Sequence, residues 1–224
     1  MGELGLIHQL IIPVFGYTVT LNLEVILMTW IVFAILIVFG IFATYKKGVV
    51  PRPLQVIGEV FVEQFYHLTE DALDREMAKT YGPLIVSLFL FLLLSNWLGL
   101  IPYLQEPTKD LNTPLSLGVM GFAIAHYAGI KSKGFKAYIM EYFQPIFFMM
   151  PLNLIGELAK IVSISFRLFG NIMGGSIIIL VVSYLTYNVV LPPLLNAFFG
   201  LFVGTIQAFV FTMLTVVYIS VQVK

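Results

Sequence analysis

The sequence contains no cysteine, and few of its side chains are charged. Asp, Glu, Lys and Arg make up 11% of the 224 residues, whereas hydrophobic residues make up 59%. Soluble globular domains hold about 25% charged and about 45–50% apolar residues. The absence of cysteine excludes disulfides and thiolate metal sites. The composition therefore excludes a soluble enzyme and a disordered chain, and it predicts a polytopic membrane protein.

Other common functional signals are also scarce. Twelve basic residues balance twelve acidic ones, so no polyanion-binding surface is indicated and nucleic acid is not an expected partner. Three histidines are too few for a histidine metal site, and no phosphate loop, HExxH or GxSxG motif occurs. We therefore expect no cofactor, no resident metal and no enzymatic activity of the isolated chain. Met1–Gln9 carries no Lys or Arg and so does not resemble a cleaved signal peptide.

Long apolar runs predict an all-α fold with about five crossings, since a spanning helix needs about 20 apolar residues. Leu54–Leu73 instead has apolar residues at helical spacing among glutamates, which predicts an amphipathic helix on the cytoplasmic surface or against a partner. Gly134–Phe143 has a shorter pattern of this kind. Pro83 is expected to open the second span, and Tyr187–Pro193 to form the turn of a C-terminal helical hairpin. The prediction is one integral membrane domain, 1–224, comprising an outer segment (1–23), spans (24–45, 83–103, 114–130), the amphipathic helix (51–76), an Arg-bearing helix (145–187) and a last helix (193–223).

The distribution of basic residues predicts the orientation. Nine of the twelve Lys and Arg residues fall in three segments that five crossings can place on one side of the membrane. Cytoplasmic loops carry the excess of basic residues. We therefore expect the N-terminus outside and the C-terminus in the cytoplasm. With no organellar presequence evident, a bacterial inner membrane is the expected location, with an organellar membrane as the alternative.

The last apolar tract contains an arginine that a membrane span rarely tolerates. From Pro145 to Val223 the only charged residues are Glu157, Lys160 and Arg167. An arginine at the centre of a span costs roughly 2.5–3.5 kcal/mol on insertion scales, and its guanidinium cannot be neutralised. Arg167 must therefore meet water, polar groups or an anion. A side chain that snorkels to the interface is the alternative, against which the central position counts.

Polar and small residues share faces on both C-terminal helices. On the Arg-bearing helix, close packing through Gly170, Gly174 and Gly175 is the structural alternative to a functional face, although it does not explain Arg167. On the last helix, the alternative is an interhelical hydrogen bond of Gln207. Glu157 and Lys160 are three residues apart, so they form either a structural pair or part of a cytoplasmic ion exit. Asp110 lies in an outer loop that is either solvated or lines an aqueous entrance. The two faces are Lys160, Ser163, Arg167, Asn171 and Gly174, and Asn196, Gly200, Gly204 and Gln207.

Several segments resemble subunit a of the F-type ATP synthase membrane sector. Ser165–Asn171 (SFRLFGN) is similar to that family's arginine signature, and Gln207–Phe209 with Leu214–Ile219 to its last helix. Ser95–Pro102 resembles its second span, and Pro151–Leu154 the approach to the arginine helix. These similarities extend across nearly the whole chain.

The resemblance implies a stator subunit, one copy per complex, beside a rotating ring of c subunits. Peripheral-stalk b subunits, other ATP synthase subunits and membrane lipid would be its further partners. The arginine helix and the last helix would lie strongly tilted against the ring. By the motif match Arg167 is the essential arginine of ion translocation, and Asn171 and Gln207 match polar positions associated with it. The chain would form two ion half-channels that carry H⁺, or alternatively Na⁺.

The chain departs from the family pattern at two positions. Many bacterial members carry Glu where this chain has Ser176, and His where it has Gly200. Neither residue here titrates, so we expect water with Ser176, Tyr184 or the Asp110 loop to replace that pair. The half-channel candidates are Glu157, Lys160, Ser163, Ser176, Gly200 and Asp110.

Two other classes of function are alternatives. A stand-alone transporter or channel would use Arg167 as the counter-charge of an anionic substrate, but it predicts inverted repeats that the sequence lacks. A structural scaffold predicts that replacing Arg167 by leucine is harmless. Only the ATP synthase subunit accounts together for the arginine helix, the glutamine helix and the lack of a repeat.

Overall fold

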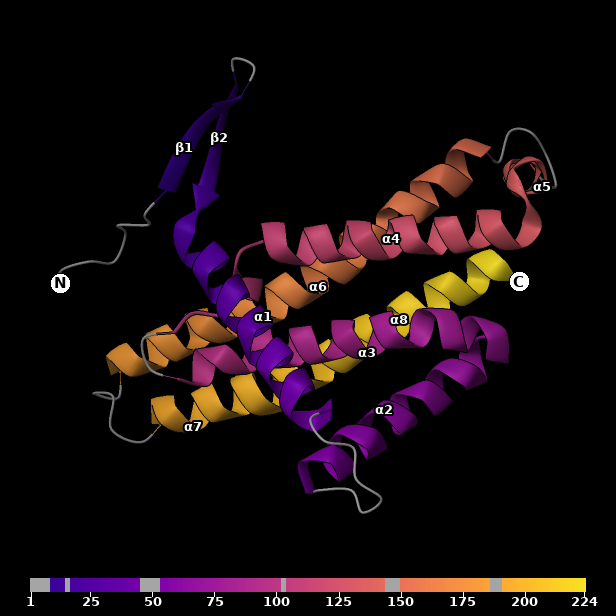
Figure 1. Ribbon diagram of the computed structural model, residues 1–224. Coiled ribbons are helices and arrows are strands. Elements are labelled where there is room, and N and C mark those ends of the chain that lie inside the picture. Colours follow the sequence, from indigo (N-terminus) through magenta and orange to yellow (C-terminus); the bar gives the residue numbers. More distant parts are fainter. Residues whose placement is uncertain (1–8, 15–16, 45–52, 102–103, 144–149, 186–190) are drawn as a thin grey trace.

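The computed structural model describes residues 9–14, 17–44, 53–101, 104–143, 150–185 and 191–224 (Figure 1). Helices form its membrane-spanning part, which confirms the predicted all-α class, and five of them are long and apolar enough to cross a membrane. The elements are β1 (Gln9–Val14), β2 (Tyr17–Asn22), α1 (Leu23–Thr44), α2 (Pro53–Ala72), α3 (Arg75–Trp97), η1 (Leu98–Leu100), η2 (Pro107–Lys109), α4 (Asn112–Lys133), α5 (Phe135–Glu141), α6 (Met150–Leu185), α7 (Leu191–Ala197), the π-helical segment η4 (Phe198–Val203) and α8 (Gly204–Val223).

The N-terminal segment holds a short β-hairpin that the sequence analysis did not predict. β1 and β2 pair antiparallel, with Gln9 opposite Asn22 and Val14 opposite Tyr17. β2 has the sequence YTVTLN, in which β-branched and aromatic residues favour an extended strand. The hairpin projects from the start of α1 (Figure 1).

Two predicted boundaries differ from the structure. Pro83 lies inside α3, which begins eight residues earlier at Arg75, so the proline does not open the helix. The polar turn at the start of α3 forms a helix before the apolar run begins, and a membrane helix tolerates the one backbone bond that proline removes. Pro192 and Pro193 lie in the first turn of α7 rather than in the hairpin turn, because the first helical N–H groups have no intrahelical partner. The rest of that predicted turn, residues 187–190, lies outside the described residues.

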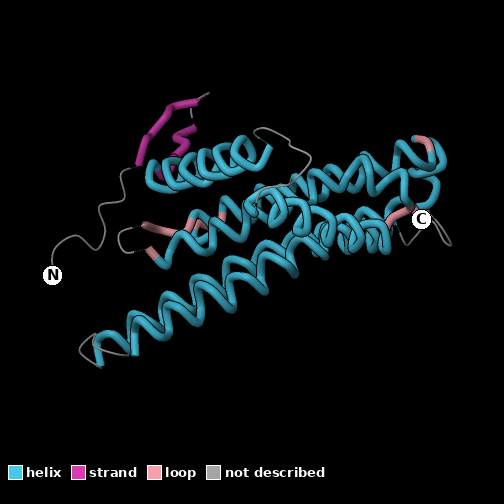
Figure 2. The backbone as a smooth tube through the Cα atoms, turned by 60° about the horizontal axis from the view of Figure 1, so that its bottom comes forward, coloured by secondary structure: helices cyan, strands magenta, loops and turns pink. Residues whose placement is uncertain are grey.

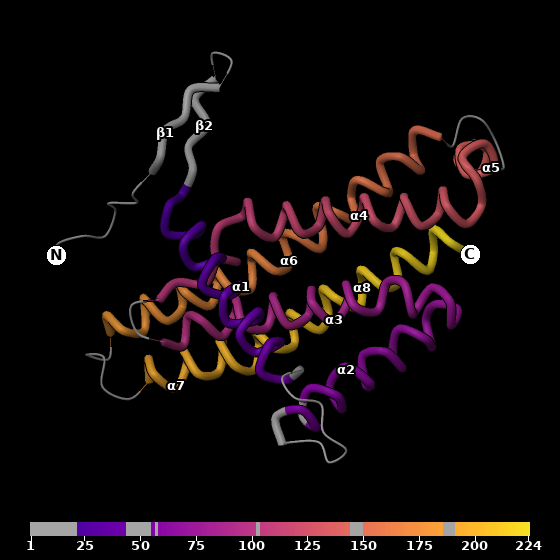
Figure 3. The backbone as a smooth tube through the Cα atoms, viewed as in Figure 1, coloured from indigo at the N-terminus to yellow at the C-terminus, as the bar shows by residue number. Residues whose placement is uncertain are grey.

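Four helices run alongside one another in the core of the bundle. α8 packs against α3 and α4, and α4 also packs against α6, whereas α1 crosses α3 at a steep angle (Figures 1 and 3). α2 packs against α3 on the side away from α4. The centre is filled by fully buried apolar side chains, among them Ile85, Leu92, Leu168, Phe211 and Ile219. Figure 2 shows α6 beside the start of the last helix, as the C-terminal hairpin predicts.

Glycines on α4 let its neighbours come close. A Cβ atom built on Gly118 would lie 2.5 Å from Ser165 Oγ of α6, and one built on Gly121 would lie 3.2 Å from a methyl carbon of Thr215 of α8. Small residues allow such close helix packing in membranes. Ser165 Oγ also donates a hydrogen bond to the carbonyl of Pro114, 3.1 Å away. Packing against α4 therefore fixes the positions of α6 and α8 along the bundle. These positions determine where the polar residues of the two helices lie relative to one another.

Candidate functional site: an exposed arginine between two polar cavities

Arg167 lies at the middle of α6, on a face that this chain leaves uncovered. Its side chain is exposed, whereas Ile164 and Leu168, on the other side of the helix, are buried. Within the part of the chain that the structure describes, Arg167 forms no hydrogen bond or ion pair. The guanidinium thus belongs to the exposed side of α6, and the polar or anionic partner that its central position in an apolar helix predicts is not among the described residues.

The small residues beside Arg167 do not pack within this chain. A Cβ atom built on Gly170 or Gly174 would meet no atom within 4 Å. Ser163, on the same stripe, is exposed as well. Of Gly170, Gly174 and Gly175, the three glycines for which close packing was the predicted alternative, only Gly175 packs closely against a described residue, with a Cβ atom lying 2.9 Å from the ring of Phe199. The face around Arg167 is therefore open to another molecule.

Asn171 and Gln207, the two predicted polar partners of Arg167, meet across the helix hairpin. Asn171 Nδ2 donates to Gln207 Oε1 at 2.7 Å. Gln207 is only 4% exposed, and its Nε2 group has no hydrogen-bond partner among the described residues. Asn171 lies one turn after Arg167, so the amide pair marks where the buried polar interior reaches the arginine face.

The π-helical segment η4 interrupts the last helix between α7 and α8. It ends at Val203, four residues before Gln207, and contains Gly200. A π-helical segment inserts residues into a helix and is frequent at functional sites. The segment lies directly before the part of the last helix in which Gln207 meets Asn171. A Cβ atom on Gly200 would lie 2.6 Å from the end of the Leu100 side chain, so a larger residue here requires that side chain to move.

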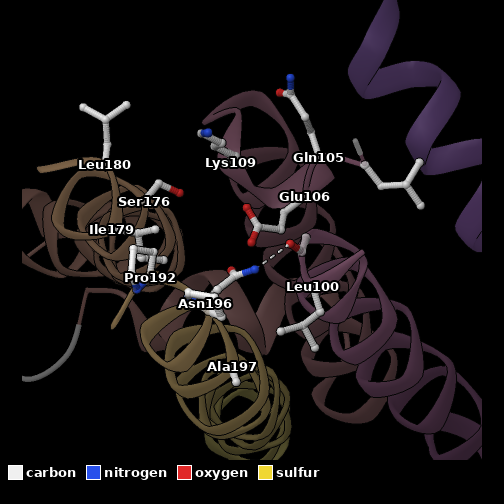
Figure 4. Close-up of a pocket in the computed structure, with 13 residues that line it drawn as sticks. Leu100, Gln105, Glu106, Lys109, Ser176, Ile179, Leu180, Pro192, Asn196 and Ala197 are labelled. Carbon is white, nitrogen blue, oxygen red and sulfur yellow. Dashed lines mark hydrogen bonds between the residues drawn. The ribbon is translucent and has the colours of Figure 1, made fainter. Parts of the chain in front are cut away.

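A polar cavity, here called the loop cavity, opens between the α3–α4 loop, α6 and α7 (Figure 4). Its volume is about 700 Å³. A second, smaller pocket of about 30 Å³, here called the extension, shares Glu106, Ser176 and Asn196 with the loop cavity and also has Asn171 and Gln207 in its lining. Ser176 lines both parts, and Gly200 lines the extension, so these two predicted candidates lie together. The other polar side chains in the lining are Asn96, Gln105, Glu106, Lys109 and Asn196.

Buried hydrogen bonds hold the loop in place beside the cavity. Asn96 is 1% exposed; its Nδ2 donates to the carbonyl of Gly204 and its Oδ1 accepts from Thr108 Oγ1, each at 2.8 Å. Trp97 Nε1 donates to Thr205 Oγ1 at 3.0 Å. One asparagine of α3 thus fixes both the loop and the start of α8, a role that its place in an apolar run did not predict.

Glu106 enters the cavity, whereas Asp110 does not. Asp110 accepts hydrogen bonds from Asn22 Nδ2 at 2.7 Å and from the backbone N–H of Asn112 at 3.0 Å, and it is not among the described lining residues. Glu106 is half-buried and lines both parts of the cavity. Burial raises the pKa of Glu106, while the Lys109 charge and the backbone N–H of Glu106 lower it. Tyr184 is 84% exposed and does not line the described cavity.

A second cavity, here called the terminal cavity, lies near the C-terminus. It has a volume of about 350 Å³ and is lined by Asn153, Glu157, Lys160 and Gln222, among others. Lys160 Nζ donates to Glu157 Oε1 at 2.6 Å, so the two residues form the predicted ion pair. The side chains of both are largely buried, and the pair borders the cavity.

A hydrogen-bond network of two tyrosine hydroxyls lies beside the terminal cavity. Tyr138 of α5 donates to Gln222 Oε1 at 2.7 Å, and Tyr142 lies 3.1 Å from both the Tyr138 hydroxyl and His126 Nε2. These contacts tie α5 to α4 and to the end of α8 (Figure 3). His126, in the C-terminal half of α4, therefore has a structural partner. The sequence offered no signal for this network because its members lie far apart along the chain.

The fold and the site together define a polytopic α-helical membrane protein with a fixed cation on an open face and a polar cavity toward either end of the same helix. Comparison with known proteins identifies the family. The ATP synthase A chain family matches residues 26–220, and the chain belongs to that family.

Several bacterial proteins described as ATP synthase subunit a are similar along most of their length. The protein of Moorella thermoacetica is 42% identical over 86% of this chain and 87% of its own. That of Aliarcobacter butzleri is 38% identical over 85% and 84%, and the subunit a 2 of Syntrophotalea carbinolica is 36% identical over 86% and 82%.

Proposed function

We propose that this chain is the ion-translocating stator subunit of an F-type ATP synthase. It would act in a complex with the other ATP synthase subunits, next to a ring of c subunits and the peripheral-stalk b subunits, as one copy in a bacterial inner membrane. The observation that carries the proposal is Arg167, a permanent cation on an exposed helix face that has no partner among the described residues. Open glycines at Gly170 and Gly174 support a helix docked against that face.

The helix lengths support a tilted arrangement. α6 has 36 residues and so is about 54 Å long at about 1.5 Å per residue. The hydrocarbon core is only about 30 Å thick. A helix of this length must either protrude from the bilayer or tilt strongly within it, and a tilted helix presents a long side to a neighbouring ring.

The chemistry of a buried carboxyl explains what Arg167 would do. A ring carboxyl must be neutral while it faces lipid, because a charge there is costly. Beside Arg167 its ionised form is favoured, so the carboxyl releases its proton there. The fixed cation also opposes direct proton flow past it. Protons that enter by one cavity must then leave by the other after the ring has turned.

The two cavities support two half-channels on either side of this barrier. The loop cavity would serve the outer side and the terminal cavity, with Glu157 and Lys160, the cytoplasmic side. Ser163 lies between the Glu157–Lys160 pair and Arg167 on the open face. Each elementary charge that moves down 100 mV releases about 2.3 kcal/mol, which would drive rotation. We assign H⁺ as the transported ion. If the activity of the complex required sodium, the transported ion would be Na⁺.

Disulfide trapping tests whether the open face meets the ring. The chain has no cysteine, so Gly174→Cys provides a single thiol on the Arg167 face. We expect this variant to cross-link with a cysteine placed one helical turn from the ring carboxyl in the assembled complex. Ile37→Cys on α1, 60% exposed but on another helix, is the matched control and should not cross-link. A complex in which Gly174→Cys gives no product would contradict the assignment.

A further inference from the structure

We propose that Glu106 is the proton-relay residue of the half-channel formed by the loop cavity. The proposal rests on the proposed function and adds the group that takes up the proton. Glu106 lies in the α3–α4 loop, whereas the residue of this loop that the sequence indicated as a half-channel candidate is Asp110.

The position of Glu106 along the route supports this role. Its side chain lines the loop cavity and also the extension, whose lining includes Asn171 and Gln207. Among the described residues that line either part, Glu106 is the only carboxylate and Lys109 the only cation. Ser176 and Asn196 line both parts too, but neither exchanges a proton in the ordinary pH range. Glu106 is therefore the only carboxyl in the described lining that can take up and release a proton, and the only charged side chain that lines both parts.

The local packing directs the carboxyl into the cavity. A Cβ atom built on Gly99 would overlap the Glu106 carboxyl, so the absence of a side chain at Gly99 lets the carboxyl approach η1. Figure 4 shows the carboxyl pointing toward Asn196 of α7 and Ser176 of α6. Thr108, two residues on, is fully buried and anchored to Asn96. The loop therefore presents Glu106 from a fixed backbone.

The electrostatic surroundings suit a group that both binds and releases protons. Burial raises the pKa of Glu106 and so favours the protonated form. The positive charge of Lys109 and the backbone N–H of Glu106 act in the opposite direction. A relay works best when its pKa lies near the operating pH, and a carboxyl whose pKa is raised above its usual range lies closer to neutrality.

The proposed transfer is a proton exchange without a redox step. A hydronium ion from the outer solution gives one proton to a carboxylate oxygen of Glu106 and leaves as water. The carboxyl then gives that proton to a water molecule in the extension and returns to the carboxylate. The proton reaches the ionised ring carboxyl near Arg167, where a new O–H bond forms.

The test is Glu106→Gln in the reconstituted ATP synthase, assayed in sodium-free buffer. We expect the rates of proton-driven ATP synthesis and ATP-driven pumping to fall about tenfold. A positioned proton-transfer group typically contributes a factor of about 10²–10⁴ to a rate. The expected loss is smaller because water in the cavity still carries some protons. Glu106→Asp should keep most of the rate. Glu63→Gln, which removes an exposed carboxylate on α2, is the control and should not change it.

A second-site variant separates a relay from a structural role. Ser176 lies on the opposite wall of the same cavity, so Ser176→Glu combined with Glu106→Gln returns a carboxyl to the route. We expect this double variant to recover the rate to within about threefold of the parent complex. Failure to recover it would overturn the relay assignment.

The stability of the complex gives an independent readout. Because the pKa of Glu106 is raised on folding, the folded chain binds more protons than the unfolded chain between the two pKa values, and its stability falls as pH rises through that window. Glu106→Gln removes this loss, so at pH 8 the dissociation temperature of the complex should equal or exceed that of the parent. A lower temperature would indicate a structural role and overturn the proposal.

Three results would distinguish this inference from the proposed function. A fully active Glu106→Gln complex whose activity still depends on Arg167 overturns the relay alone. Pumping that survives loss of Arg167 overturns the proposed function. A parent complex that is inactive without sodium overturns the assignment of protons to Glu106.

Discussion

Replacing Arg167 by alanine is expected to abolish ATP-driven ion pumping by the reconstituted complex, lowering the rate by at least about 100-fold. This is the scale on which the loss of one preorganised charge-stabilising group slows an enzyme. Without the guanidinium, the described part of α6 offers no unpaired cation to favour the ionised form of a ring carboxyl, since Lys160 is paired with Glu157, so we expect the carboxyl to stay protonated and the ion not to be released. The barrier between the cavities is also lost, and we expect a passive proton leak through the membrane sector.

Two companion variants isolate the role of the charge. Arg167→Lys keeps a cation but can lose its proton when desolvated, so we expect intermediate pumping that declines at high pH. Arg75→Ala removes an arginine whose pairing with Glu70 lies at the surface, with the Arg75 side chain 79% exposed. Such pairs contribute little, and pumping should be unchanged. Proton flux is measured with a pH-sensitive dye in vesicles, and undiminished pumping by Arg167→Ala would refute the proposed function.

Gly129→Ala is expected to destabilise the chain and to reduce its assembly into the complex. A Cβ atom at this position of α4 would lie 2.8 Å from the backbone carbonyl oxygen of Gln222 and 2.7 Å from the ring of Tyr138. The carbonyl belongs to α8 and cannot rotate away, so two packed helices must separate. Overpacking of this kind costs about 1–3 kcal/mol, and the Tyr138–Gln222 hydrogen bond would be strained too.

Gly40→Ala is the matched control for that variant. It also lies within a helix, but a Cβ atom there would meet nothing within 4 Å. Alanine favours helix over glycine by about 0.5–1 kcal/mol, so this change should be neutral or slightly stabilising. The dissociation temperature and the yield of intact complex should fall for Gly129→Ala only. Equal behaviour of the two variants would show that α4 and α8 do not need their close approach.

Sequence and structure agree best for features that depend on residues close together in the chain. The apolar runs gave the helices that are long enough to cross a membrane, since hydropathy over about 20 residues is a local property. The spacing of Glu157 and Lys160 predicted their ion pair for the same reason. The β-hairpin and the continuation of α3 through Pro83 were missed, because flanking polar segments carry weaker signals.

The sequence by itself determined that this chain is a helical membrane protein with one cation, Arg167, that cannot be neutralised and stands in mid-helix. Only the tertiary structure decided which polar groups surround the route to it. Asn171 meets Gln207 from 36 positions away, and Asp110 turns to Asn22 from 88 positions away while Glu106 enters the cavity. Such contacts depend on how far one helix is shifted along another. In this bundle, close contacts at glycines constrain how far the helices are shifted, and local hydropathy does not encode those contacts.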